Sequence, residues 1–383
     1  MDSTPEDATS GYAQPDPDVG YLDPNVSYAD SIATLTFSKP EVGVIGVAYA
    51  LVFVVGIVGN CFVIAVVART PQMWCATHFF IANLAFADVL VLMFCLPVNF
   101  IQNVFFDYIL GLFVCKVVTW LQGVSVSVSV TTLAAISLER YFAICYPIRY
   151  QMSLQIARRV IVCTWIYSCA AFVPWLVYYH LFTPYPQRLP DIEQCRDWWP
   201  SPLARTLHYL FVTFFATYFL PLLIISGTYM MIFARVWRRE IPGDATTARY
   251  YDKLASKQKV KVAKMVLIVV CMFALSWLPL HVLYMLSMFG AVPYATMSEA
   301  GKHAYRYVQV FVLWLGIANS SVNPVVYAYL NRKYRLGFRA ILRSRSCSKR
   351  LQLSHVGGSS RQTVHSSCVD PTEEVLQSHS TAV

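Results

Sequence analysis

Residues 42–68 read VGVIGVAYALVFVVGIVGNCFVIAVVA, an unbroken run without a charged side chain. A helix needs about 20 predominantly apolar residues to cross the hydrocarbon core of a bilayer, and this run is long enough. It carries one amide side chain, Asn60. Because polar groups inside a membrane are costly, those that occur there are candidates for function. The run therefore predicts a membrane-spanning helix with a functional polar residue.

Six further apolar stretches follow the first. The chain is 57% hydrophobic and only 13% charged, whereas soluble domains carry roughly 25% charged residues. We therefore expect an all-α membrane protein, a seven-transmembrane helix bundle over 42–331. The predicted helices lie at about 42–68, 79–106, 113–145, 158–179, 205–236, 260–289 and 305–330.

The distribution of Lys and Arg predicts the orientation of these helices, since basic residues gather on the cytoplasmic side. With the N-terminus outside, seven of the 30 basic residues are extracellular: Lys39, Lys116, Arg188, Arg196, Arg205, Lys302 and Arg306. The opposite orientation would invert this bias. We expect a multi-pass protein of the plasma membrane with an extracellular N-terminus. The net charge of +9 then lies along the cytoplasmic membrane face, where it suits anionic lipids and does not indicate nucleic-acid binding.

This topology places only Cys115 and Cys195 of the 11 cysteines in the oxidising compartment. One lies at the outer end of the third helix and the other in the loop before the fifth. We expect a disulfide that holds this long loop over the bundle, the alternative being two free thiols.

The two tails are predicted to be disordered. Residues 1–41 are acidic, lack the basic-then-apolar pattern of a secretory signal, and carry a glycosylation sequon at Asn25.

Residues 332–344 alternate basic and apolar side chains at helical spacing, which predicts a short amphipathic eighth helix on the membrane surface. Cys347 is a candidate palmitoylation site.

The cytoplasmic tail, 345–383, offers two further interactions. The candidate phosphorylation sites that would recruit arrestin are Ser359, Ser360, Thr363, Ser366 and Ser367. The last four residues, 380–383, resemble a ligand of PDZ domains, whose sheet edge captures a terminal strand and its carboxylate.

The polar residues inside the helices occur in a characteristic order. In chain order they and their neighbours are Gly59-Asn60, Asn83-Leu84-Ala85-Phe86-Ala87-Asp88, Cys115 with Glu139-Arg140-Tyr141, Trp165, Pro221 with Tyr229, Phe273 with Trp277 and Pro279, and Asn323-Pro324 with Tyr327. In this order and at these spacings they resemble the rhodopsin-like (class A) G-protein-coupled receptors over about residues 44–342. That resemblance implies a receptor that signals through a heterotrimeric G protein.

Within that family, the chain is similar to neuropeptide receptors of the orexin, allatotropin and trissin group. The similarity lies in 121–128, 141–145, 195–198 and 238–243. Trp277, Leu313 and Tyr108 depart from the orexin receptors, so a related peptide fits as well as orexin. Coupling to Gq and calcium release is what the resemblance to peptide receptors suggests.

The ligand is expected in the outer third of the bundle. Amine receptors carry an Asp where this chain has Gln122, and opsins need a Lys in the seventh helix, where 307–331 has none. A neutral amide suits a peptide backbone or an amidated terminus. Acidic residues of the loop, Asp197 among them, would attract a cationic peptide. The expected ligand-binding residues are Asn99, Gln102, Gln122, Val126, Trp175, Asp197, Tyr209, His281, Tyr284 and Gln309.

The resemblance also implies roles for the deeper residues. No cofactor is expected, but the resemblance implies an allosteric sodium ion. The residues expected to hold this ion are Asp88, Ser129, Asn319, Ser320 and Asn323. An activation switch is expected at Val130, Pro221, Phe273, Trp277 and Pro279, because both prolines remove a helical hydrogen bond. G-protein coupling is expected at Glu139, Arg140, Tyr229 and Tyr327, with Arg140 paired to Glu139 in the closed state.

Two other function classes remain open alternatives to a peptide receptor. A sodium-coupled secondary transporter would also use a midplane Asp, but transporters are usually built from internal repeats and none is found here. A class A receptor for a non-peptide ligand is the second. An enzyme is not expected, because no nucleophile–base pair or metal-ligand cluster occurs outside the buried polar network.

Overall fold

The computed structural model describes residues 36–105, 107–146, 152–183, 192–237, 247–293 and 296–343, and within 247–259 it describes the backbone alone. The predictions for Asn25, for Cys347, for most of the N-terminal tail and for the C-terminal tail after Arg343 lie outside these described residues.

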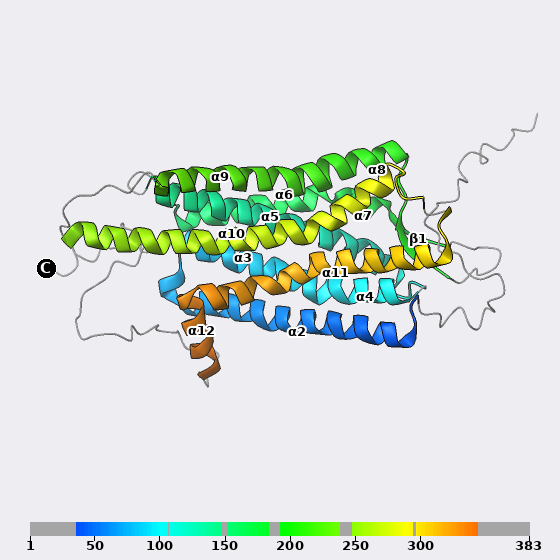
Figure 1. Ribbon diagram of the computed structural model, residues 1–383, viewed down its shortest axis with the longest axis horizontal. Coiled ribbons are helices and arrows are strands. Elements are labelled where there is room, and N and C mark those ends of the chain that lie inside the picture. Colours follow the sequence, from blue (N-terminus) through cyan, green and yellow to red (C-terminus); the bar gives the residue numbers. More distant parts are fainter. Residues whose placement is uncertain are drawn as a thin grey trace, which may run out of the picture.

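Seven helical spans in the described part of the chain are long and apolar enough to cross a membrane. They run side by side along the long axis of the molecule (Figure 1). Their bounds are Lys39–Arg69, Ala76–Val104, Gly111–Cys145, Leu154–Tyr178, Pro202–Trp237, Val260–Met288 and Glu299–Leu330. The seven-transmembrane bundle predicted from the sequence is thus confirmed.

These spans are composed of the following elements: α2 (Lys39–Arg69); α3 (Ala76–Leu90), η2 (Val91–Cys95) and α4 (Leu96–Val104); α5 (Gly111–Cys145); α6 (Leu154–Ala171) and α7 (Val173–Tyr178); α8 (Pro202–His208), η3 (Tyr209–Phe219) and α9 (Leu220–Trp237); α10 (Thr247–Met288); and α11 (Glu299–Leu330). A short helix, α12 (Arg332–Arg343), follows the seventh span, and the strands β1 (Tyr179–Phe182) and β2 (Gln194–Asp197) precede the fifth.

Two helices begin earlier than hydropathy alone predicts because serines cap them. The Ser298 hydroxyl accepts a 3.2 Å hydrogen bond from the Gly301 amide, which starts α11 at Glu299 rather than near 305. The Ser153 hydroxyl does the same for the Ile156 amide at 3.3 Å and starts α6 at Leu154. Such caps satisfy amides that have no partner within the helix, so they extend a helix into a charged segment.

The helix α5 lies at the centre of the bundle. Burial differs between the most apolar 18-residue windows of the spans. In α5, 67% of these residues are buried inside the protein, whereas in the span of α6 and α7 only 11% are. Close packing at Gly123 holds these two spans together, since a Cβ there would lie 2.4 Å from the Phe172 ring. The outward faces of α6 and α7 therefore meet lipid.

Two segments are wound as π-helices rather than α-helices: η2, which ends two residues before Pro97, and η3, which ends two residues before Pro221. Proline has no amide hydrogen for the carbonyl four residues earlier, so the regular bonding pattern is interrupted at this point. π-helical turns are rare and frequently occur at functional sites. Both segments lie in the half of the bundle nearer the β-hairpin (Figure 1).

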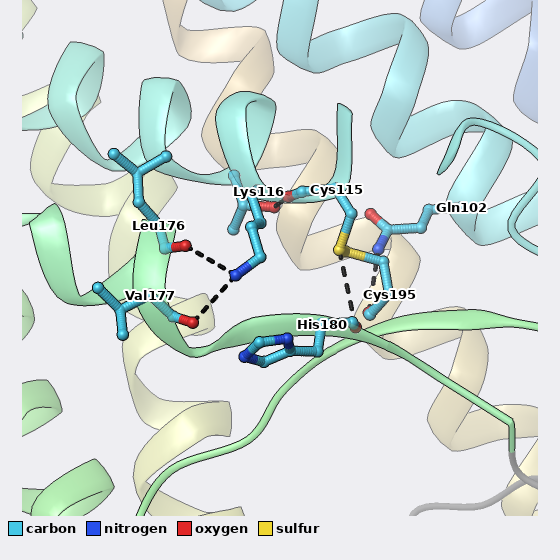
Figure 2. The surroundings of a disulfide bond; sticks show 8 residues. Gln102, Cys115, Lys116, Leu176, Val177, His180 and Cys195 are labelled. Carbon is cyan, nitrogen blue, oxygen red and sulfur yellow. Dashed lines mark hydrogen bonds between the residues drawn. A yellow bond between two sulfur atoms is a disulfide. The ribbon is translucent and has the colours of Figure 1, made fainter. Parts of the chain in front are cut away.

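The antiparallel pair β1–β2 covers one end of the bundle, here called the hairpin end. A disulfide joins Cys115 of α5 to Cys195 of β2, with Cα atoms 5.6 Å apart, and confirms the predicted bridge (Figure 2). Beside it, Lys116 Nζ donates 3.1 Å hydrogen bonds to the last carbonyls of α7, those of Leu176 and Val177. The bridge and this cap fix the hairpin to α5 and α7.

Tyr108 completes the contact between the hairpin and the loop before α5. It is buried, and its amide donates a 2.8 Å hydrogen bond to the Glu193 carbonyl. Burial raises the pKa of the Tyr108 hydroxyl to about 12. The side chain therefore stays neutral and contributes its ring to the apolar contact around the disulfide.

At the opposite end, here called the α12 end, α12 turns away from the bundle and crosses its axis at a steep angle (Figure 1). Tyr334 is fully buried, and a Cβ at Gly337 would lie 2.6 Å from Val66 of α2. The helix is thus packed against α2 through one face, with its basic side chains on the others.

Candidate functional site

At the hairpin end, polar contacts join α4 to its neighbours. The Asn99 amide donates a 2.9 Å hydrogen bond to the Gln122 side-chain oxygen of α5 and a 2.7 Å bond to the Cys95 carbonyl. Gln102, one turn further along α4, donates to the Cys195 carbonyl at 3.4 Å (Figure 2). Asn99 and Gln122 are therefore bonded to each other, and Gln102, a third predicted ligand-binding residue, lies one turn along α4 and bonds beside the disulfide.

A second group of predicted residues gathers around His281 of α10. The Tyr209 hydroxyl lies 2.9 Å from His281 Nδ1, and the Tyr209 and Tyr284 rings are 5.4 Å apart. His281 is itself buried, whereas Tyr284 is 45% exposed. Tyr284 thus offers the accessible surface of this cluster, and Tyr209 connects it to the buried imidazole.

Two residues that the sequence did not single out complete the cluster. The Tyr218 ring centroid lies 4.4 Å from that of His281, and Phe214 approaches the same ring edge-on at 5.6 Å. Tyr209 and Tyr218 are nine residues apart, which is about 2.5 turns of an α-helix and would place them on opposite faces. The wider winding of η3 brings both onto His281. Pro221, which follows η3, was the one available sign of this distortion.

From this cluster, contacts continue to the bend in α10. The Tyr218 hydroxyl donates a 2.8 Å hydrogen bond to the Ala274 carbonyl. This carbonyl is next to that of Leu275, whose usual helical donor is replaced by the Pro279 nitrogen. Tyr218 therefore contacts both the histidine and the backbone at the interrupted part of α10.

The predicted switch residues pack directly below. The Phe273 ring lies 6.4 Å from that of Tyr218 and 6.2 Å from that of Trp277. Trp277 packs against Gly316 of α11, where a Cβ would lie 3.2 Å from the indole ring. Val130 belongs to the same core cluster, and Pro221 is buried nearby in α9. The Trp277 ring is therefore packed closely against the backbone of α11.

The remaining predicted ligand-binding residues lie around these two groups. The Trp175 ring packs edge-on against that of Phe172, with centroids 4.9 Å apart. Val126 is partly buried and packs against the main hydrophobic core. Gln309 is exposed and lies two turns before Gly316 on the same face of α11. Asp197 pairs with Arg205 at 2.7 Å and accepts a 2.7 Å bond from the Trp199 indole, so its charge is balanced within the loop.

Deeper in the bundle, a polar network surrounds Asp88, which is 1% exposed. Its carboxylate accepts a 2.7 Å hydrogen bond from the Asn323 amide and a further one from the Ser320 hydroxyl. The Asn60 amide donates to the Ser320 carbonyl at 2.9 Å and so joins α2 to the same network. Ser129 is buried, but no hydrogen bond joins it to Asp88 within the described residues.

This network is rich in acceptors and poor in donors. The side-chain oxygens of Asn60, Asn319 and Asn323 are buried without a hydrogen-bond partner among the described residues. A buried carboxylate also needs a proton, a partner charge or a metal ion. Because amide, hydroxyl and carboxylate oxygens are what hard cations prefer, these residues fit a small cation such as sodium. No cluster of three His, Cys, Asp or Glu side chains that would suit a transition metal is found in the described ranges.

At the α12 end, Arg140 is held by its neighbours. Its Nε and Nη2 atoms donate 2.5 Å hydrogen bonds to the two carboxylate oxygens of Glu139. Nη2 also donates to Thr77 of α3, whose hydroxyl donates to Glu139 at 2.9 Å. The pair predicted for a closed state is therefore present, and Thr77, which the sequence did not single out, ties it to α3.

The other two residues predicted for G-protein coupling, Tyr229 and Tyr327, contact neighbouring helices in this structure. The Tyr229 hydroxyl donates a 2.8 Å hydrogen bond to the Ala263 carbonyl of α10. The Tyr327 ring stacks on Tyr334 of α12, with centroids 5.6 Å apart, and the Tyr334 hydroxyl lies 3.1 Å from His78 Nδ1. These contacts hold α9 against α10 and α11 against α12.

Comparisons with known proteins agree with this arrangement. Residues 59–327 match the family of seven-transmembrane receptors named after rhodopsin. The chain is 32% identical over 307 residues to the substance-P receptor of Aquarana catesbeiana, a match that covers 79% of this chain and 71% of the relative. It is 33% identical over 338 residues to human neuropeptide FF receptor 1, covering 84% and 76%. Mouse neuropeptide FF receptor 2 is 33% identical over 331 residues, covering 83% and 76%. These relatives are neuropeptide receptors and do not single out the orexin, allatotropin and trissin group.

The hydrogen bond between Tyr209 and His281 gives the first prediction. The substitution Tyr209→Phe removes the hydroxyl and leaves a buried imidazole nitrogen without its partner. We expect the free energy of unfolding of the purified protein in detergent to fall by about 0.5–1.5 kcal/mol, measured by thermal melting. Tyr329→Phe, at a side chain that is 79% exposed, is the matched control and should melt as the wild type does. Equal melting of the two variants would contradict the assigned contact.

Proposed function

We propose, from the premise that this chain belongs to the rhodopsin family of seven-transmembrane receptors, that it is the plasma-membrane receptor for an extracellular neuropeptide. In this proposal the hairpin end faces outward and receives the peptide. The α12 end faces the cytoplasm and engages a heterotrimeric G protein. The observation that carries the proposal is the continuous set of contacts from Tyr209 and His281 to the bend in α10 at Pro279.

The orientation is supported by charge and by redox chemistry. It places the disulfide between Cys115 and Cys195 in the oxidising compartment. It also places the basic face of α12, with Arg332, Arg339 and Arg343, at the cytoplasmic membrane surface. There we expect α12 to lie on anionic lipid, with Cys347 beyond it as the proposed acylation site.

The chemistry of the hairpin end suits a peptide. Asn99, Gln122 and Gln102 offer neutral amides that both donate and accept hydrogen bonds, as a peptide backbone or an amidated terminus requires. Tyr284 and Trp175 offer rings for apolar side chains. Acidic loop residues such as Glu193, together with the acidic N-terminal tail, favour the approach of a cationic peptide by electrostatic steering.

Activation would follow from a shift between two states of α10. A peptide that contacts Tyr284 or the Tyr209–His281 pair changes the position of Tyr218, whose hydroxyl bonds to the Ala274 carbonyl one turn before Pro279. The part of α10 nearer the α12 end can then move outward. The free energy by which the peptide favours the open state equals the difference between its binding free energies to the two states.

At the cytoplasmic end, opening would free the groups that the closed state holds. Tyr229 would leave the Ala263 carbonyl as α10 moves, and Arg140 would exchange Glu139 for the G protein. Tyr327 would separate from Tyr334. We propose coupling to Gq with release of calcium.

The network around Asp88 would act as an allosteric cation site. Asp88, Ser129, Asn319, Ser320 and Asn323 would hold a sodium ion, which supplies positive charge to a buried carboxylate. Asn60, with its unpartnered side-chain oxygen, is added to the five residues predicted from the sequence. If the closed state alone holds the ion, sodium and peptide must oppose each other by linkage.

Several further partners belong to the proposal. Arrestin would bind the phosphorylated C-terminal tail, and a PDZ domain would bind its last four residues. A glycan at Asn25 would mark the outer surface. Each of these positions lies outside the described residues.

The alternative functions are less well supported. A sodium-coupled transporter is not favoured, because 59–327 match a receptor family. A non-peptide ligand is not favoured either, because the relatives reported above are peptide receptors. The family assignment also means that the chain is not an enzyme.

The experiment that tests this proposal is calcium release in transfected cells exposed to a panel of synthetic neuropeptides, both amidated and disulfide-bonded. We expect at least one cationic peptide to act. Gln122→Ala should then lower its potency about tenfold, the effect of losing one hydrogen bond in a desolvated site. Gln155→Ala, at an exposed position of α6, is the control for the substitution itself. If the peptide is equally potent at the Gln122→Ala and Gln155→Ala receptors, Gln122 does not contact the peptide.

The cation site gives a separate prediction about binding. In membranes of the wild type, raising sodium should weaken the affinity of the active peptide. Asp88→Asn removes the charge that attracts the ion, so we expect this sensitivity to disappear in radioligand competition. Choline in place of sodium controls for ionic strength. An unchanged effect of sodium in Asp88→Asn would refute the site.

A further inference from the structure

A hollow of about 450 Å³ lies on the outside of the bundle, between α5 and α6. It is lined by Thr131 of α5 and by six residues of α6: Ile156, Arg159, Val160, Cys163, Thr164 and Tyr167. Its volume is within the range of small-molecule sites. Because α6 is the least buried of the spans, this hollow, here called the α6 groove, opens toward lipid and not toward the interior of the bundle.

The α6 groove runs along one helical face. Its α6 residues recur at the three- and four-residue spacing that places side chains in one row. From Ile156 to Tyr167 this row extends about 16 Å at 1.5 Å per residue, roughly half the 30 Å thickness of a hydrocarbon core. The groove therefore has the length of one leaflet and begins near the α12 end of the bundle.

The lining of the α6 groove between its two ends is mostly apolar. The Thr131 hydroxyl donates to the Ser127 and Val128 carbonyls of its own helix, at 2.7 and 3.2 Å, so its polar group is already satisfied. Cys163 is an exposed free thiol. Tyr167 lies at the other end of the row from Ile156 and is 41% exposed, and its hydroxyl is hydrogen-bonded to Thr217 of η3. Small side chains between Ile156 and Tyr167 thus leave room for an apolar chain.

One charge, Arg159, lies at the shallow end of the groove. It is exposed, and the span of α6 and α7 contains no acidic residue to pair with it. The neighbouring Arg158 points toward α3, where its guanidinium lies 5.6 Å from the centroid of the Phe79 ring. Arginine near the end of a membrane helix extends its head toward the interface while its stem covers apolar surface. Arg159 is therefore placed to meet a headgroup above the groove.

We propose that the α6 groove binds an anionic phospholipid, with the headgroup on Arg159 and one acyl chain between Ile156 and Tyr167. The inference goes beyond the proposed function, and it rests on that function only for the statement that the cytoplasmic leaflet supplies the lipid. Charge complementarity and the one-leaflet length favour this occupant. A sterol carries no charge for Arg159, and a second copy of α6 would present another arginine to it.

The test is native mass spectrometry of the purified full-length protein, titrated with phosphatidylserine or phosphatidylcholine of identical acyl chains. We expect the first phosphatidylserine to bind about fivefold more tightly than phosphatidylcholine, the effect of one basic side chain at an anionic surface. Arg159→Gln should abolish this preference. Arg158→Gln removes the same charge from the side of α6 that faces α3, and should preserve the preference for phosphatidylserine.

A second variant tests the groove independently of charge. Cys163→Trp fills the space between Ile156 and Tyr167 and should weaken the binding of the first phosphatidylserine while Arg159 is intact.

Equal binding of the two lipids to the wild type would overturn the proposal. An equal loss of the phosphatidylserine preference in Arg158→Gln and Arg159→Gln would overturn it as well. Displacement of phosphatidylserine by equimolar cholesterol would assign the groove to a sterol. Dimers cross-linked through Cys163 at the expense of bound lipid would assign it to a second copy. Because none of these measurements uses a peptide or a G protein, their failure leaves the proposed function untouched.

Discussion

A polar group inside a bilayer must find its hydrogen-bond partner within the protein, because lipid offers none. This constraint explains why the chain crosses the membrane only as helices and why the polar side chains of those helices face each other. Asp88 pairs with Asn323, Arg140 with Glu139, and Tyr209 with His281. Each pair joins residues that would be costly to bury alone. The energetic penalty that confines these groups to the interior also brings them together, so the buried polar contacts coincide with the residues that we propose as functional.

The same contacts lie where the helices depart from regular winding. The π-helical η3 places Tyr209 and Tyr218 on one histidine, and Tyr218 also bonds to the Ala274 carbonyl, one turn before Pro279 in α10. A helix can kink where its bonding pattern is interrupted, by a proline or a π-helical turn, and in our proposal it takes up two arrangements there. The contacts at the α12 end, from Tyr229 to Ala263 and from Tyr327 to Tyr334, hold one of these arrangements. In this account a peptide acts by changing which arrangement is the more stable.

The sequence predicts the seven spans well because length and hydropathy determine them. It predicts the bridge from Cys115 to Cys195 because the expected topology places only these two cysteines in the oxidising compartment. It predicts helix ends less well, since a serine cap such as Ser298 extends α11 into a charged segment that hydropathy assigns to a loop. Tyr218 could not be found from periodicity, because α-helical spacing puts it opposite Tyr209. Thr77 and Tyr334 were missed because their roles depend on partners in other helices, Glu139 and Tyr327, that no local pattern reveals.

The central claim is that an external peptide moves the α12-end half of α10 without passing through the bundle. Distances between spin labels at Lys264 of α10 and Gln155 of α6 test it most directly, with a second pair at Leu203 and Phe289 of the hairpin end, all four being exposed. The labels are placed in a background in which the exposed cysteines are replaced by serine. Saturating peptide should lengthen the first distance by several ångströms while the second changes little. An unchanged first distance in a protein that still activates its G protein would contradict the account.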